Sequence, residues 1–207
     1  MIPPGGAVHR FSLETFAKTG HSPTLEDIRQ VFAPLSSVEV ADSLVAELER
    51  RGSVHRNAGD REVTHAYPFS NEPTPHKVQL ADGPQVYAMC AIDALGMPFM
   101  LKKDAEIYSA CTQCRGEIQI QFQSGHIRQE RPKGIVVWFP AMKEKCLAAT
   151  DLCPAVNFFC SAVHLGQWRA GHPVQSGQRL TLLQALEHGR KTFEPLLQEG
   201  MKEGADA

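Results

Sequence analysis

The stretch that decides the fold of the second half of this chain is Val86-Tyr-Ala-Met-Cys-Ala-Ile-Asp-Ala-Leu-Gly96. Its apolar residues predict a short buried helix from about Val86 to Leu95, closed by Gly96 and Pro98. Cys90 and Asp93 are three residues apart, so on a helix both side chains lie on one face. Cys90 then lies near the helix N-terminus, where the helix dipole lowers the pKa of a thiol. An acid beside a thiol can carry the thiol's proton to another atom, as general acid–base catalysis requires.

The same residues also allow a purely structural interpretation, in which Cys90 fills space and Asp93 caps the helix at the surface. A second cysteine, Cys153, precedes a proline at the edge of an apolar stretch, which predicts a turn that enters a buried segment. Cys160 lies within that apolar stretch, where packing is favoured over reaction. Cys146 follows Lys-Glu-Lys, and the pattern predicts no role for it.

Cys111-Thr-Gln-Cys114 is a CxxC motif, which suggests a redox dithiol or half of a zinc site. A zinc site would need two further ligands in a compatible pattern, and the sequence has neither a second CxxC nor an H-x3-H. A redox dithiol would follow a strand and open a helix, whereas strand-like residues follow Arg115-Gly116. We therefore favour a turn between two strands, with Cys111 packed inward.

Composition excludes few classes of protein. The 207 residues fit one large domain or a small domain and a medium one. With 21 basic and 23 acidic residues, the net charge of −2 gives no reason to expect nucleic acid or an anionic membrane as partner. No stretch approaches the roughly 18 apolar residues of a membrane span, and the N-terminus lacks the pattern of a secretory signal. We expect a cytoplasmic protein, whose six cysteines are free thiols, metal ligands or catalytic groups.

The N-terminal part of the chain has the pattern of a small separate module. Two prolines and two glycines in residues 1–10 predict a flexible arm. Three helical patterns follow, and two strand-like segments, 53–56 and 62–67, then flank a glycine-containing turn. Three helices and a hairpin are typical of a winged-helix module, here over residues 11–70. The helices begin near Phe11, at the capping box of Thr24 and Asp27, and after Ser37.

A winged helix could bind DNA, which would require basic and amide side chains on the third helix. That helix instead exposes acidic side chains, which oppose binding to phosphates. We therefore expect no nucleic-acid partner, and favour a packing or lid role for the module. The acidic residues are Glu39, Asp42, Glu47 and Glu49, and positive charge is found only at Arg50 and Arg51.

The proline-rich residues 68–77 predict a linker, after which we expect a mixed α/β domain over residues 71–207. Short strands are predicted in it, which we expect to be antiparallel, and a last helix from Leu180 to Leu197. The predicted fold class is thus α+β. The predicted strands are 77–80, 117–122 and 134–139.

The two cysteine motifs resemble those of the organomercurial (alkylmercury) lyase family. Residues 86–96 look like the family's signature helix, with its Cys and its Asp at this spacing. Cys153-Pro-Ala-Val-Asn-Phe-Phe159 resembles the second cysteine motif. Tyr67-Pro-Phe-Ser and Pro73-Thr-Pro-His76 look like the stretch that leads into the family's core. The resemblance covers roughly residues 11–197 and implies that the second domain is the catalytic one.

The resemblance implies an alkylmercury lyase that contributes to mercury resistance and detoxification. Cys90 and Cys153 would bind mercury, a soft metal that prefers thiolates, and Asp93 would carry the proton and complete the metal site. An organomercurial would be cleaved to a hydrocarbon and bound Hg(II), with no organic cofactor and with external thiols removing the ion. The resemblance also allows transfer of the Hg(II) product to a mercuric reductase.

Two residues depart from the family pattern, and other functions stay open. The family's additional structural cysteine corresponds to Cys111, whereas Cys114 has no counterpart, and Pro154 stands where some members carry a second Cys. The alternatives are a non-catalytic thiol-based binder of mercury or another soft metal, a different reaction on the same scaffold, and a metal-responsive regulator. Asp93 distinguishes the first, because binding needs no proton carrier.

Overall fold

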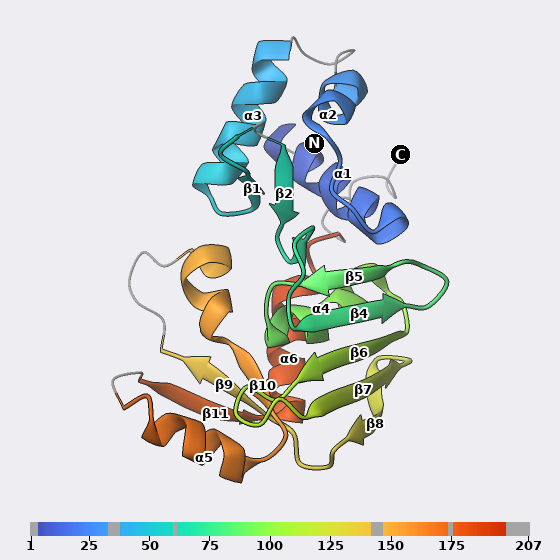
Figure 1. The fold of residues 1–207 in the computed structure, drawn as a ribbon. Coiled ribbons are helices and arrows are strands. Elements are labelled where there is room, and N and C mark those ends of the chain that lie inside the picture. Colours follow the sequence, from blue (N-terminus) through green and yellow to red (C-terminus); the bar gives the residue numbers. More distant parts are fainter. Residues whose placement is uncertain (1–3, 33–37, 60–61, 142–146, 174–175, 198–207) are drawn as a thin grey trace.

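The structure, a computed structural model, describes residues 4–32, 38–59, 62–141, 147–173 and 176–197. Its helices and antiparallel sheets form a mixed α+β fold, as the sequence predicts. Three N-terminal helices lie at one end, and two sheets with further helices make up the rest (Figure 1). Among the described residues, no helix is long and apolar enough to cross a membrane.

The N-terminal part has the predicted order of three helices and a hairpin. Thr24 and Asp27 form the predicted capping box, since each backbone N–H binds the other's side chain. Ser37, predicted to cap the third helix, lies outside the described residues. One prediction is wrong: residues 4–10 are helical where a flexible arm was expected, and Val8 is fully buried there. The elements are α1 (Pro4–Thr19), α2 (Leu25–Phe32), α3 (Val38–Arg50), β1 (Val54–Arg56) and β2 (Val63–Ala66).

The larger sheet continues from this hairpin without a break. The predicted linker contains β3 (Phe69–Ser70), which pairs with β2 through His65 and Ser70 and with β5 (Gln85–Ala88) on its other side. The prolines around β3 therefore do not free the segment from the sheet. The strand order is β1-β2-β3-β5-β4-β6-β7-β8, with every pair antiparallel. The remaining strands are β4 (His76–Leu80), β6 (Ala105–Ala110), β7 (Glu117–Gln123) and β8 (His126–Arg131).

The smaller sheet has the order β10-β9-β11 and is also antiparallel. Two short helical turns lead into β10, and α5 follows it, so β10 lies between the turn that begins at Cys153 and α5 (Figure 1). The elements are β9 (Val136–Pro140), the π-helical turn η1 (Ala148–Leu152), the 3-10 turn η2 (Cys153–Ala155), β10 (Asn157–Phe159), α5 (Ala162–Ala170) and β11 (Gly177–Thr181).

The helix predicted from Val86 to Leu95 is shifted along the chain. Val86 to Ala88 belong to β5, and α4 runs from Ala91 to Leu101 with Cys90 as its N-cap. A short apolar run does not distinguish a buried strand from a buried helix, and here the run contains the end of one and the start of the other. The last helix is shorter than predicted as well, because α6 spans Leu182–Phe193 and the two residues before it complete β11.

Helices α4 and α6 cross at a pair of glycines. A Cβ atom added to Gly189 would lie 2.9 Å from the backbone nitrogen of Gly96 and 2.9 Å from the carbonyl oxygen of Ile92. A Cβ on Gly96 would lie 2.1 Å from the ring of Phe193. The glycines therefore allow the two backbones to approach closely, and this contact fixes the position of the helix that begins after Cys90.

Candidate active site

The structure brings the three predicted site residues together. The Cys90 sulfur accepts a hydrogen bond from the backbone N–H of Asp93 at 3.4 Å. Cys153, which is 60 residues further along the chain than Asp93, donates from its sulfur to Asp93 Oδ2 at 3.3 Å. The Cys90 and Cys153 sulfurs and a carboxylate oxygen of Asp93 all lie within 4.8 Å of one another.

Local structure explains this arrangement. Cys90 at the N-cap and Asp93 at the third helical position occupy the places of a capping box, with a thiol in place of the usual hydroxyl. Cys153 begins η2, in the turn predicted to enter a buried segment. The N–H of Ala91 donates to the carbonyl of Val156 at 3.2 Å. The N–H of Val156 in turn donates to the carbonyl of Cys153 at 3.1 Å. Backbone hydrogen bonds thus hold the Cys153 turn against the start of α4.

Burial controls the protonation of the site. Cys90 and Cys153 are 2% and 3% exposed, and Asp93 is fully buried rather than a surface cap. Burial raises the pKa of Asp93 from its ordinary 3.8 to about 7, although interactions with Cys90, Cys153 and Tyr67 oppose the shift. Burial, the contact with Cys153 and the charge of Asp93 raise the pKa of Cys90. The prediction that the helix dipole lowers this thiol's pKa is therefore wrong, because burial outweighs the dipole.

The pKa of the second thiol is raised as well. The contact with Cys90 lowers the pKa of Cys153, but burial and the charge of Asp93 together raise it above its ordinary value. Asp93 Oδ1 is buried and accepts no hydrogen bond from the described residues. Leaving a buried acceptor unsatisfied costs about 1–3 kcal/mol, so this oxygen is suited to hold a proton or to contact a ligand.

Tyr67 is a site residue to which the sequence assigns no role. The phenol of Tyr67 lies beside the site, because burial and the charges of Asp93, Cys153 and Cys90 all raise its pKa. Its ring packs against Phe193 of α6, with the ring centres 5.3 Å apart. The available signal was the Tyr67-Pro-Phe-Ser stretch, which carries part of the family resemblance without indicating that the tyrosine approaches the cysteines.

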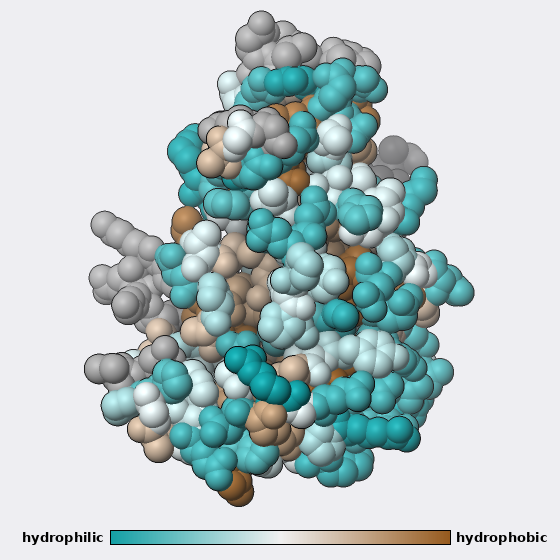
Figure 2. Space-filling model, viewed as in Figure 1, coloured by the Kyte–Doolittle hydropathy of each residue, from teal (hydrophilic) through white to brown (hydrophobic). Residues whose placement is uncertain are grey.

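A pocket of about 420 Å³ leads to this site. Of the three site residues, Cys153 lines the pocket, together with residues of the hairpin, the proline-rich segment and η1. Figure 2 shows a hollow of weakly hydrophobic surface, drawn in tan, below the N-terminal helices. The hairpin contributes His55 and His65 to the pocket wall, and the proline-rich segment contributes Pro73 and Pro75. Most of the pocket surface is apolar, and the Cys153 thiol forms part of its lining.

The other cysteines form a second group. Cys111 is fully buried in the turn between β6 and β7, as predicted. Cys160 does more than pack, because its sulfur lies 2.9 Å from Nδ1 of His164 and 3.8 Å from the sulfur of Cys114. His164 carries no signal in the sequence apart from its position four residues after Cys160. Cys146 lies outside the described residues.

Two buried thiols that share one buried carboxyl group define a site suited to a soft metal centre. A family model described as alkylmercury lyase matches residues 69–194, which include all three site residues. The chain therefore belongs to the alkylmercury lyase (MerB) family, and the predicted family is confirmed.

Individual relatives agree with this assignment. An alkylmercury lyase of Bacillus cereus is 28% identical over 179 residues, covering 86% of this chain and 72% of that protein. One of Staphylococcus epidermidis is 28% identical over 174 residues, covering 84% of this chain and 70% of that protein. A crystal structure of the mercury-bound form of MerB2 superposes with a TM-score of 0.80 at 25% identity, covering 95% of this chain and 93% of that one.

Proposed function

We propose that this protein is an alkylmercury lyase that cleaves carbon–mercury bonds by protonolysis. The products are a hydrocarbon and Hg(II) held by the thiolates of Cys90 and Cys153. The observation that carries the proposal is the 3.3 Å contact between the Cys153 sulfur and Asp93 Oδ2, because it gives a proton a direct path from a thiol to a carboxylate. Membership of the alkylmercury lyase family supports the same activity.

The chemistry balances with these three side chains alone. Cys153 displaces the counter-ligand X of R–Hg–X, which forms a sulfur–mercury bond, and its proton passes to the carboxylate of Asp93. The sulfur of Cys90 then joins the mercury and its proton leaves with X as HX, so that two thiolates donate electron density to the metal. Asp93 then returns the proton to carbon, and the electron pair of the carbon–mercury bond forms the C–H bond. Hg(II) stays on two thiolates and Asp93 is again a carboxylate, with no change of oxidation state.

The pKa of Asp93 suits this role. A proton carrier works best when its pKa is close to the pH at which it operates, and burial raises the pKa of this carboxyl group to about 7. An exposed carboxyl group with a pKa near 3.8 would be a poor acceptor of a thiol proton. The raised pKa is also why a binder without catalysis is the less favoured function, since binding alone needs no proton carrier.

The pocket suggests the order of events. Cys153 is the site residue that lines it, whereas Cys90 and Asp93 do not, so an incoming R–Hg–X meets Cys153 first. The apolar wall formed by Pro73, Pro75 and Met89 suits the organic group R. External thiols would then remove Hg(II) from the buried dithiolate, or pass it to a mercuric reductase.

We further propose that the elements α1 to β3 form a winged-helix module with a lid role and that the elements from β4 onward form the catalytic domain. Support comes from the hairpin, whose His55 and His65 line the pocket, so that the module supplies part of the wall. We also propose action in the cytoplasm, since a reducing compartment keeps Cys90 and Cys153 as thiols.

The test is benzene release from phenylmercury in excess low-molecular-weight thiol, measured by gas chromatography. Asp93→Asn keeps the shape of the side chain but cannot accept and return the proton, so benzene release should fall at least about a hundredfold. Asp82→Asn is the matched control, because Asp82 lies in an exposed turn at φ 52°, a conformation that Asn adopts readily. It should release benzene at the wild-type rate.

The binding alternative gives a different pattern in the same experiment. If wild type binds one mercury tightly but releases no benzene, the protein is a binder and the proposal is wrong. If Asp93→Asn releases benzene as fast as wild type, the reaction does not run through Asp93. Cys153→Ser should lose both benzene release and tight mercury binding.

A further inference from the structure

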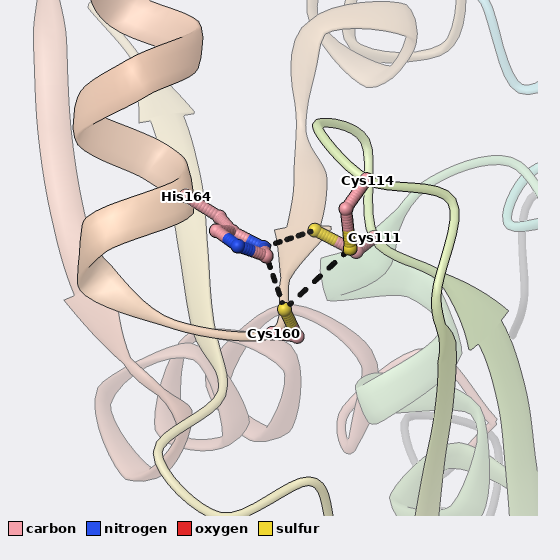
Figure 3. A group of neighbouring side chains, drawn as sticks. All are labelled: Cys111, Cys114, Cys160 and His164. Carbon is pink, nitrogen blue, oxygen red and sulfur yellow. Dashed lines mark hydrogen bonds between the residues drawn. The ribbon is translucent and has the colours of Figure 1, made fainter.

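We propose that Cys111, Cys114, Cys160 and His164 bind one structural zinc ion at a site separate from Cys90, Asp93 and Cys153. Three sulfur atoms and one imidazole nitrogen, all within 4.8 Å of one another, form the ligand set of a Cys3His site. Figure 3 shows the four side chains converging from the β6–β7 turn and from the start of α5. The proposal does not depend on the lyase activity.

The distances fit a tetrahedral ion. Zinc bonds of about 2.3 Å to sulfur and 2.0–2.1 Å to nitrogen place tetrahedral ligands about 3.8 Å apart for two sulfurs and about 3.6 Å apart for sulfur and nitrogen. The sulfurs of Cys114 and Cys160 are 3.8 Å apart, and the Cys111 sulfur is 3.7 Å from Nδ1 of His164. The Cys160 sulfur lies 2.9 Å from the same nitrogen, so zinc would require a shift of less than about 1 Å at that contact.

The CxxC half of the site lies in a turn that hydrogen bonds hold in place. The N–H of Gly116 donates to the Cys114 sulfur at 3.4 Å. Arg115, between them, has a φ of 61°, and its N–H donates to the carbonyl of Cys111 at 2.8 Å. The turn therefore curls around the two sulfurs and leaves them pointing to the same side (Figure 3).

The other half is a Cys-x3-His pair at the start of α5. Ser161 is the N-cap of this helix, and its hydroxyl accepts from the N–H of His164 at 3.2 Å. The cap fixes His164 in the first helical turn, one turn above Cys160. A spacing of three residues between the ligands of the second pair lies within the range of structural zinc sites.

Zinc at this position would join the two sheets. Cys111 follows β6 of the larger sheet, and Cys160 follows β10 of the smaller one. A backbone hydrogen bond already links them, since the N–H of Thr112 donates to the carbonyl of Phe158 at 3.1 Å. The ion would hold the ends of β6 and β10 together and so stabilise β10, the strand that follows Cys153.

Metal content tests the proposal directly. The untagged full-length chain, produced with zinc in the medium and purified under reducing conditions without chelators, should contain one zinc per chain by mass spectrometry. Cys114→Ser and His164→Ala should lose it, and circular dichroism would verify that they are folded. Replacing zinc by cobalt(II) should give the thiolate charge-transfer and tetrahedral d–d absorption bands in wild type and not in these two variants.

Two controls separate this site from other thiols and histidines. His172→Ala removes an exposed histidine just after the same helix, and Cys90→Ser with Cys153→Ser removes both thiols of the lyase site. Both should keep one zinc per chain. The proposal is overturned if wild type neither contains zinc nor binds added zinc, if His164→Ala keeps it, or if only the Cys90 and Cys153 double variant loses it. It is also overturned if thiol counting finds a Cys114–Cys160 disulfide in the reduced preparation.

Discussion

The crossing of α4 and α6 offers a sharp test of the packing, because α4 carries Asp93. In Gly189→Ala the new Cβ would lie 2.9 Å from the nitrogen of Gly96 and from the carbonyl oxygen of Ile92, and 3.0 Å from the Gly96 Cα. All three are backbone atoms and cannot rotate away. Ordinary contacts between such atoms begin near 3.5 Å, so the two helices must separate by about half an ångström.

The expected cost comes from two opposing effects. Overpacking a core typically costs about 1–3 kcal/mol, whereas replacing Gly by Ala within a helix gains about 1 kcal/mol. Gly166→Ala separates overpacking from helix propensity, because Gly166 lies within α5 and a Cβ there has nothing within 4 Å. This control variant gains stability from helix propensity and has no overpacking. The difference in free energy of unfolding between the two variants should therefore be about 1–3 kcal/mol, with Gly189→Ala the less stable.

Urea unfolding followed by circular dichroism measures this difference. In thermal unfolding it should appear as a lower melting temperature for Gly189→Ala, by about 2–4 °C for each kcal/mol in a chain of this size. Benzene release should also fall in Gly189→Ala relative to Gly166→Ala, since moving α4 moves Asp93 away from Cys153. If Gly189→Ala unfolds at the same urea concentration as Gly166→Ala or a higher one, the close approach of the two backbones is wrong.

Further predictions concern Asp93 and the cap of α6. Folding raises the pKa of Asp93 from 3.8 to about 7. Between these pH values the folded state therefore binds more protons than the unfolded state. The contribution of this carboxyl group to stability is complete below pH 3.8 and falls as the pH rises to about 7. Asp93→Asn should therefore lose stability less steeply than wild type over this range in urea unfolding, and parallel curves would contradict the pKa. Thr181→Ala removes the hydroxyl that accepts from the N–H of Gln184 at 3.2 Å and should cost about 0.5–2 kcal/mol. Thr192→Ala, whose hydroxyl bonds back to the His188 carbonyl within the helix, should be close to neutral, and equal effects of the two substitutions would refute the capping argument.

The sequence predicts the local elements well where one periodicity dominates. Helical spacing and the Thr24 capping box locate α2, and alternation in Glu117–Gln123 locates β7. The same reasoning fails at Val86, where β5 passes into α4 within one apolar run. It also fails at the proline-rich segment, because polar and proline residues around Phe69 hide a two-residue strand that only pairing with β2 and β5 stabilises.

The site was predictable to the extent that its motifs are local. Cys90 and Asp93 lie in one motif. Cys153 lies in a second motif, which the resemblance to the lyase family identifies. The catalytic roles of these three residues stay predictions. Burial reversed the predicted shift of the Cys90 pKa, because spacing along a helix carries no information on what covers it. His164 was missed since its nearness to Cys111 depends on how the two sheets meet, which no short motif encodes.

The unbroken path of the larger sheet from β1 to β8 bears on how this protein can be cut or recombined. Strand β2 covers one side of β3, so a chain shortened to begin after Ala66 would present unpaired backbone N–H and C=O groups along β3. An exposed edge of this kind recruits other strands and favours aggregation. The N-terminal helices and hairpin are therefore not an appendage that can be exchanged at the prolines, and a graft between relatives should keep β2 and β3 from the same parent.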